Sequence, residues 1–261
     1  MKPIVRRQAR IAIAYALAGV ACLVVLALRY GRFPLGYWIL FSIAFFALEF
    51  RAVEVNDRML QSSGSMVLLT AGTLFALQPD TNAAFAIAAM AAVGPLVPND
   101  LKERRWFQPI SNFGQLVVSA TVAGLILDGL LVDMAAPTAR GFVNVAIAGA
   151  AASVAYTAVN VTMVRSAVRY VYGQRMLLPW SGLHLLLPAQ VLLGLMGGLL
   201  GAAFFTADKQ AVIVLILAVY LIAHLSFSSY AQLREAHQAA LRGFVKALEA
   251  RDLYTRGHTE R

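Results

Sequence analysis

The chain has 261 residues, of which 60% are hydrophobic and only 13% are charged, and its mean hydropathy is +0.70. A soluble globular domain carries about 25% charged residues, so this composition excludes an ordinary water-soluble protein. The formal net charge of +9 fits either a nucleic-acid-binding protein or a membrane protein with basic cytoplasmic loops, and the positions of the basic residues decide between them.

The apolar residues are gathered into eight runs, which charged or turn-forming residues separate. A helix needs about 20 apolar residues to cross the hydrocarbon core of a bilayer, within a range of about 17–25. Most of the runs fall in or near that range, and stretches such as residues 22–26 do not alternate in polarity as a membrane β-strand would. The runs are Ile11–Leu28, Pro34–Leu48, Ser65–Leu77, Ala83–Val97, Ile110–Leu127, Gly141–Val164, Leu183–Ala207 and Ala211–Phe227.

We therefore predict an all-α, polytopic helical membrane protein. The two runs over residues 65–97 are short and form either two short helices or a re-entrant hairpin, so six to eight spans are expected, with eight favoured. With eight spans and a cytoplasmic N-terminus, 18 of the 22 Lys and Arg residues lie on the cytoplasmic side. Both termini are expected in the cytoplasm, and no nucleic-acid partner is expected.

Polar side chains inside the spans are candidates for a ligand-sensing site, because burying them in lipid is costly. Gln108, Asn112 and Gln115 follow one another at spacings of four and three residues, which places them on one helical face. The alternative is ordinary hydrogen bonding between helices, worth about 0.6 kcal/mol per bond. The candidates for binding a small ligand of unknown identity are Gln108, Asn112, Gln115, Asp128, Asn160, Gln190 and His224.

Four glycines in the seventh run form two overlapping pairs at a spacing of four residues, Gly194 with Gly198 and Gly197 with Gly201. Small residues at this spacing let two helices approach closely. The close contact is expected either within one subunit or between two.

The composition changes after Phe227. Residues 231–242 are strong helix formers without proline, and an apolar stripe then recurs in steps of four, four, three and four residues. We expect a transmembrane sensor or anchor domain over residues 1–229 and a cytoplasmic linker helix over residues 230–248 that pairs as in a short coiled coil. The stripe on this signalling helix consists of Leu233, His237, Leu241, Phe244 and Leu248.

A distinctive motif follows the stripe. Its positions are Glu249, Ala250, Arg251, Asp252, Tyr254, Thr255, Gly257, His258 and Arg261. With these residues, the segment 244–261 closely resembles the opening of an HD-GYP domain, although Leu253 stands where a proline is common in that family. The resemblance implies that residues 249–261 begin a domain that hydrolyses the bacterial second messenger cyclic di-GMP. His258 matches a histidine that is a metal ligand in the wider HD superfamily.

The resemblance also implies a bacterial inner-membrane protein, a homodimer formed through the spans and the linker helix, and a divalent metal of the iron or manganese type in the complete domain. The His-Asp pair and the Gly-Tyr-Pro motif of the family do not occur in this chain. A single histidine cannot assemble a metal centre that activates water. We therefore expect the chain as given to have no catalytic residue and no cofactor, and to be truncated at the start of the HD-GYP domain.

The expected function is that of a membrane-embedded sensory and regulatory region, which passes a signal from the spans through the linker helix to a cytoplasmic phosphodiesterase domain. The first alternative is a transporter or a substrate-binding membrane component. The second is a passive membrane anchor and dimerisation module. The lipid bilayer is a partner in all three.

Overall fold

The computed structural model describes residues 3–31, 35–49, 53–56, 59–61, 64–95, 106–131, 139–173, 180–206, 236–246 and 248, together with isolated positions between 213 and 233. The chain divides into two compact units, which are described separately. The first unit contains residues 1–51 and 62–216, and the second contains residues 52–61 and 217–261.

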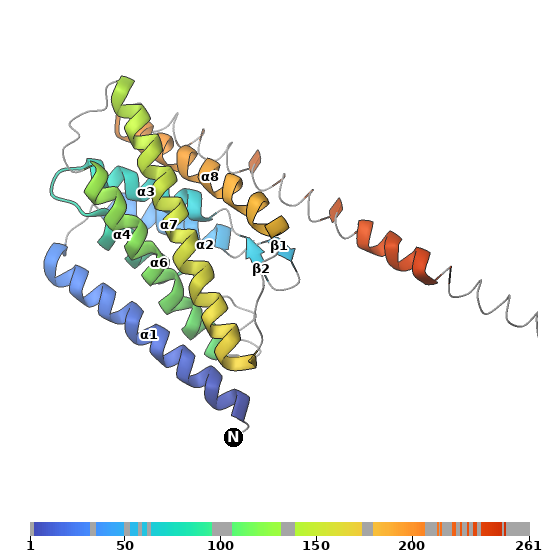
Figure 1. The fold of residues 1–261 in the computed structure, drawn as a ribbon. Coiled ribbons are helices and arrows are strands. Elements are labelled where there is room, and N and C mark those ends of the chain that lie inside the picture. The colour runs from blue at the N-terminus through green and yellow to red at the C-terminus, as the bar shows by residue number, and fades with distance from the viewer. Residues whose placement is uncertain are drawn as a thin grey trace, which may run out of the picture. The chain divides into compact units, whose positions relative to one another are not determined.

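The first unit is a bundle of helices, drawn in Figure 1. Proline suits the first position of a helix because it lacks the N–H that would be unpaired there, and α1 begins at Pro3. α7 is followed by Gly173 at a φ of 68°, the left-handed conformation that commonly ends a helix. The helices are α1 Pro3–Tyr30, α2 Leu35–Glu49, α3 Gly64–Leu77, α4 Ala83–Ala91, α6 Phe107–Leu131, α7 Ala139–Tyr172 and α8 Trp180–Thr206.

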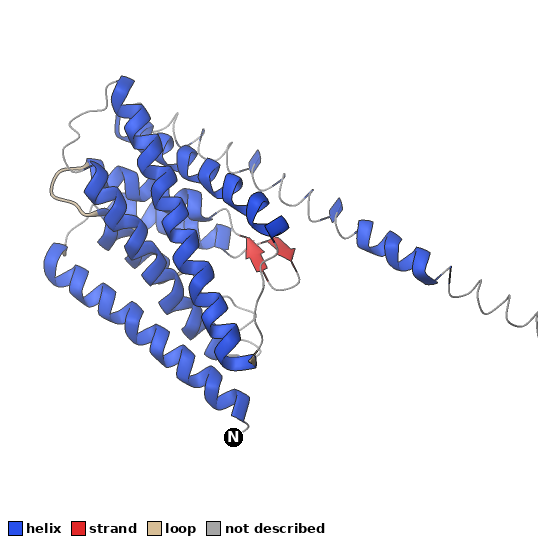
Figure 2. Ribbon diagram, viewed as in Figure 1, coloured by secondary structure: helices blue, strands red, loops and turns tan. Residues whose placement is uncertain are grey.

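The described residues also contain one short antiparallel hairpin, coloured red in Figure 2. β1 (Val53–Asn56) pairs with β2 (Met59–Gln61), with Glu54 opposite Leu60. Valine alternates with polar residues along β1, and β-branched residues favour extended backbone. The hairpin belongs to the second unit and was not expected from the sequence.

The prediction of an all-α polytopic membrane protein is confirmed. Seven of the eight apolar runs coincide with described helices, while most of the run over residues 211–227 lies outside the described residues. Four helices are long and apolar enough to cross a membrane, by length and composition, and two further apolar helices are shorter. The four are Ile4–Tyr30, Phe107–Leu131, Gly141–Tyr172 and Leu187–Thr206.

The runs over residues 65–97 form two short helices, α3 and α4, which residues 78–82 connect. At 1.5 Å per residue, α3 is about 21 Å long and α4 about 14 Å, so neither is long enough to cross a hydrocarbon core of about 30 Å. The favoured count of eight spans, which included this pair, is therefore too high, and the lower end of the expected range fits. Nearly every residue of both helices is buried. α3 packs against α2, α4, α6, α7 and α8, so this short helix forms the core of the bundle.

α6 lies between α1 and α7, as Figure 1 shows. The backbone of Tyr15 in α1 touches Gly114 in α6, and Gly19 lies beside Val117. From the first contact to the second, the residue number rises in both helices. α1 and α6 therefore run in the same direction and begin at the same end of the bundle.

α7 runs in the opposite direction to α1. The Oη of Tyr15 donates a hydrogen bond of 2.7 Å to the carbonyl oxygen of Met163, and the Nε2 of Gln8 donates one of 3.2 Å to the Oη of Tyr172. The start of α1 therefore lies beside the end of α7.

α8 packs against α7 through Gly194 and Gly198. A Cβ on Gly194 would lie 2.5 Å from the carbonyl oxygen of Gly149, and a Cβ on Gly198 would lie 2.6 Å from that of Val145. Real Cβ atoms do not approach backbone oxygens this closely, so only glycine permits the contact.

The second glycine pair of α8 packs against α3. A Cβ on Gly197 would lie 3.0 Å from the carbonyl oxygen of Met66, and a Cβ on Gly201 would lie 2.5 Å from that of Thr70. Both glycine pairs are thus used within one subunit, which is the first of the two arrangements that their spacing allows.

Candidate functional site

Two of the predicted site residues, Gln115 and Asn160, meet between α6 and α7. The Nε2 of Gln115 donates a hydrogen bond to the Oδ1 of Asn160. One turn along α6, the Oγ of Ser119 donates to the carbonyl oxygen of Gln115 at 2.8 Å. One turn along α7, the carbonyl oxygen of Met163 accepts the bond from Tyr15 of α1. We call Tyr15, Gln115, Ser119 and Asn160 the polar seam.

A glycine brings the helices of the polar seam together. A Cβ on Gly114 would lie 1.9 Å from the carbonyl oxygen of Tyr15, so the backbones of α1 and α6 are in direct contact here. This close approach lets the Tyr15 side chain reach the backbone of α7. Ser119 is fully buried, while Gln115 and Asn160 are half-buried. The polar seam therefore lies at the interface between helices, and part of it is accessible from outside the bundle.

The polar seam lies well inside the bundle. Its Tyr15–Met163 bond is seven residues along α1, and nine along α7, from the Gln8–Tyr172 bond at the end of the two helices. At 1.5 Å per residue, this separation is about 12 Å. Arginine and tyrosine are typical of the membrane–water interface, and the Gln8–Tyr172 end is rich in both. Arg165 follows Asn160 by five residues in α7, about 8 Å, so the seam would lie inside the hydrocarbon region but nearer its arginine-rich boundary than its middle.

The side chains of the polar seam suit recognition of a polar molecule. After their mutual hydrogen bond, Gln115 keeps its amide oxygen and a second N–H, and Asn160 keeps its NH₂ group. These donors and acceptors fit a small neutral ligand. The seam contains two amides, a hydroxyl and a phenol, all of which can donate or accept hydrogen bonds to a ligand.

Three predicted residues lie outside the polar seam. Gln108 is exposed at the start of α6, and Asn112 is half-buried and makes no side-chain hydrogen bond with another described residue. Of the three residues on the predicted helical face, only Gln115 takes part in the seam. His224 lies outside the described residues.

Asp128 caps the start of α4 from the far end of α6. Its Oδ1 accepts a hydrogen bond of 2.8 Å from the N–H of Ala83, and its Oδ2 accepts one of 3.0 Å from the N–H of Ala84. Asn82 donates to the same carboxylate at 2.7 Å, and its Oδ1 accepts from the N–H of Phe85 at 2.9 Å. The first N–H groups of a helix have no partner within it and attract negative charge. Asp128 therefore links α6 to α4.

Gln190 lies where α8 contacts α7. Its carbonyl oxygen accepts a hydrogen bond of 2.7 Å from the Oγ of Ser153. The Gln190 side chain is only 4% exposed, and its Oε1 has no hydrogen-bond partner in the described part of the chain. No hydrogen bond joins Gln190 to the described residues of the polar seam.

Metal-binding residues do not cluster in the described ranges, which contain no group of three or more His, Cys, Asp or Glu that could hold a metal ion. His258, the metal ligand that the resemblance implies, lies outside these ranges. A single histidine does not provide a metal site, and the metal chemistry of the family would belong to a complete hydrolase domain. The other motif residues also lie outside the described ranges, namely Glu249, Arg251, Asp252, Tyr254, Thr255, Gly257 and Arg261.

Within the range predicted as a linker helix, residues 236–246 are helical and belong to the second unit. Its apolar stripe is uncovered: Leu233 is 71% exposed, Phe244 is 69% exposed and Leu248 is 61% exposed. Leu241 and His237 on the same stripe are exposed as well. The pairing of this helix with a second copy stays a prediction.

Sequence reasoning missed three residues that join helices. Tyr15 lies within an apolar run, four residues before Gly19. A polar aromatic residue one turn from a glycine was the sequence feature that could have indicated a contact between helices here. Asn82 directly precedes an alanine-rich helix, a typical capping position. Ser153 lies among alanines and other small residues of α7, and its spacing from other polar residues does not distinguish it.

Comparison of the chain with protein families, with curated proteins and with solved structures gives no match. A functional assignment therefore rests on the residues and the geometry of the chain itself.

Proposed function

We propose that the chain is the membrane-embedded sensory and regulatory region of a bacterial HD-GYP cyclic di-GMP phosphodiesterase. The observation that carries this proposal is the motif from Glu249 to Arg261, which directly follows a helix with an apolar stripe. In this arrangement the helical bundle receives a signal, the linker helix transmits it, and the hydrolase domain that begins at Glu249 responds.

The directions of the helices support a cytoplasmic N-terminus in an inner membrane. The arginine-rich start of α1 lies beside the end of α7, which carries Arg165 and Arg169. Asp128 contacts Ala83, so the connection between α3 and α4 lies at the opposite end. Basic residues gather on the cytoplasmic side of membrane proteins. We infer that the arginine-rich end faces the cytoplasm, where a hydrolase domain would meet cyclic di-GMP.

The polar seam is the proposed sensing site. Polar side chains at this depth are costly in lipid, and functional sites are a common reason for their presence. The Gln115–Asn160 bond joins α6 to α7, and the Tyr15–Met163 bond joins α7 to α1. A ligand that replaced the first bond would alter the contact between α6 and α7. α8 follows α7 in the chain and packs against it, so a shift of α7 would also be felt by α8.

Replacing Gln115 or Asn160 by leucine should change cyclic di-GMP hydrolysis by the full-length enzyme about fivefold or more, the range of a typical allosteric coupling. Leucine removes the hydrogen bond between the two amides and remains compatible with a membrane helix. Hydrolysis is measured on protein reconstituted in liposomes and divided by the amount of inserted protein. Ser166→Ala is the matched control on α7, because Ser166 is exposed and, among the described residues, bonds only to the carbonyl of Thr162 in its own helix.

Normal hydrolysis in both leucine variants would contradict the sensing role and favour a passive anchor. Uptake of a solute by vesicles that contain the chain would instead favour the transporter.

A further inference from the structure

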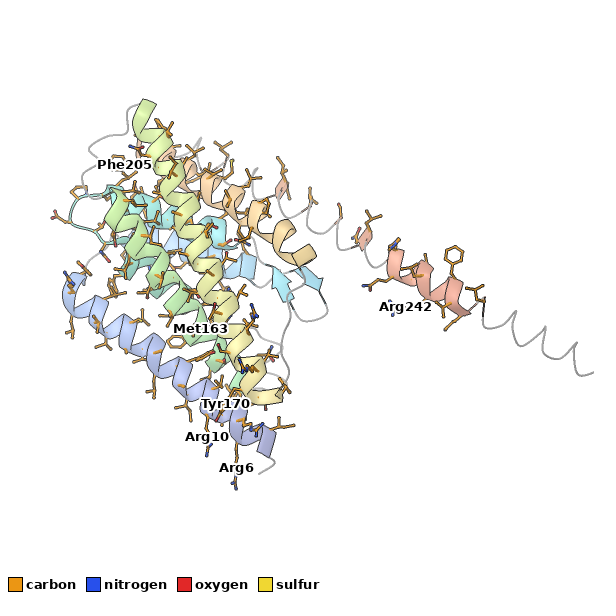
Figure 3. The ribbon with its side chains drawn as sticks, in the orientation of Figure 1. Arg6, Arg10, Met163, Tyr170, Phe205 and Arg242 are labelled. Carbon is orange, nitrogen blue, oxygen red and sulfur yellow. The ribbon has the colours of Figure 1, made fainter. Side chains whose placement is uncertain are left out.

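One end of the bundle carries five arginines from two neighbouring helices. Figure 3 labels Arg6 and Arg10 on α1 and Tyr170 on α7 at this end. The two helices are joined here by the hydrogen bond of 3.2 Å between Gln8 and Tyr172. We call the five arginines the basic ledge, and all five are exposed: Arg6, Arg7, Arg10, Arg165 and Arg169.

The arginines of α7 lie on the side of that helix that faces α1. Arg165, Arg169 and Tyr172 are spaced by four and three residues, which places them on one helical face. Tyr172 on this face bonds to Gln8 of α1. Arg7 of α1 directly precedes Gln8 in the chain. At about 100° per residue, Arg7 lies to one side of Gln8 and so near this contact, whereas Arg6 and Arg10 lie on the opposite face of α1.

The charge of the basic ledge is not neutralised within these helices. Neither α1 nor α7 contains an Asp or a Glu residue. None of the five arginines forms an ion pair with another described residue. The five arginines therefore have no acidic partner within these two helices.

The length of the helices places the basic ledge at the level of lipid headgroups. At 1.5 Å per residue, α1 is about 42 Å long and α7 about 51 Å, whereas the hydrocarbon core measures about 30 Å. The apolar part of α1 begins at Ile11 and that of α7 ends at Val164. The first two turns of α1 and the last two turns of α7, which carry the arginines, would therefore project past the hydrocarbon on the same side.

Exposed aromatic residues mark the same level. Tyr170 and Tyr172 are 41% and 54% exposed at the end of α7, and Trp106 is 53% exposed before α6. Gly114 touches Tyr15, and Trp106 and Arg7 each lie eight residues before these contact points. Trp106 and the ledge thus share one level, and tryptophan and tyrosine gather where hydrocarbon meets headgroups.

We propose that the basic ledge binds the headgroup of an anionic phospholipid, with arginines of both helices holding its phosphate. The guanidinium group presents a fork of N–H donors that matches the oxygens of a phosphate, and it forms two parallel hydrogen bonds with them. A bound lipid would hold the ends of α1 and α7 together beside the Gln8–Tyr172 bond. The site depends on the membrane fold and not on the proposed link to a hydrolase.

The test measures lipid binding to the purified chain in neutral detergent by native mass spectrometry. Dioleoylphosphatidylglycerol should bind about tenfold more tightly than dioleoylphosphatidylcholine. The double variant Arg165→Gln/Arg169→Gln should bind the anionic lipid about tenfold more weakly than the parent chain. Arg29→Gln is the matched control, because Arg29 lies at the other end of α1, over the ring of Tyr30. This control should retain the parent affinity.

Equal affinity of the parent chain and the glutamine double variant for phosphatidylglycerol would overturn the proposal. Displacement of the lipid by an excess of inorganic phosphate would also overturn it, since the ledge would then be a site for a free anion. Arg165→Lys/Arg169→Lys keeps the charge but loses the fork, and it should weaken binding about threefold. If the glutamine variant lost its helical structure, unchanged binding by the lysine variant would decide against the site.

Discussion

Gly114→Ala should lower the free energy of unfolding by about 3 kcal/mol, at the upper end of the usual cost of overpacking. The added Cβ would lie 1.9 Å from the carbonyl oxygen of Tyr15 and 2.1 Å from its carbonyl carbon. Both atoms belong to the backbone of a helix, so no side-chain rotation relieves the overlap and α1 must move away from α6. This movement would also weaken the hydrogen bond between Tyr15 and Met163. Reversible unfolding in mixed detergent micelles measures the loss.

Gly129→Ala provides a matched control on the same helix. A Cβ on Gly129 would meet nothing within 4 Å. Alanine is favoured over glycine inside a helix by about 0.5–1 kcal/mol, so this variant should be as stable as the parent chain or slightly more stable. Similar unfolding free energies for Gly114→Ala and Gly129→Ala would contradict the close approach of α1 and α6.

Asp128→Ala should lower the free energy of unfolding by about 3 kcal/mol, because it removes hydrogen bonds to a charged acceptor and leaves buried donors unpaired. The donors are the backbone N–H groups of Ala83 and Ala84 and the amide of Asn82. Asp128→Asn keeps one acceptor oxygen and should cost about half as much. The same unfolding measurement applies.

The control for Asp128 is Asp80→Asn, a change of the same chemistry in the α3–α4 connection. Asp80 is exposed and has a φ of 60°, a conformation that asparagine also tolerates. This substitution should alter stability by less than about 0.5 kcal/mol. Equal effects of the two asparagine variants would show that Asp128 does not hold α4 in place.

The positions of the helices along the chain could be predicted, but their arrangement could not. Charged residues end an apolar run where a helix leaves the hydrocarbon, so the positions of α1, α6 and α7 follow from composition, although α1 begins eight residues before its apolar run and α7 ends eight residues after its own. Composition does not show which helices are neighbours, because a side chain facing lipid is as apolar as one facing another helix. The glycines of α8 indicated a close contact, yet nothing in their spacing shows that Gly194 meets α7 while Gly197 meets α3.

The candidate site was predicted as separate residues and not as a group. Gln115 and Asn160 stand out because amides are rare inside apolar runs, but their pairing depends on the register of α6 against α7. Asp128 stands out for the same reason, although its partners are backbone N–H groups that no sequence pattern reveals. Tyr15 escaped notice because tyrosine is common in membrane helices and its role depends on the neighbouring Gly114.

The short lengths of α3 and α4 have a consequence for how the protein is made. Neither helix can be stable alone in a bilayer, and much of the wall around them is supplied by α6, α7 and α8, which the ribosome delivers later. The two central helices are therefore synthesised before the helices that surround them. We expect residues 64–95 to remain at the membrane surface until α8 has been synthesised. Protease should cut this segment in nascent chains stalled before Trp180 and spare it in chains extended past Thr206, and equal cleavage in both would refute this order of insertion.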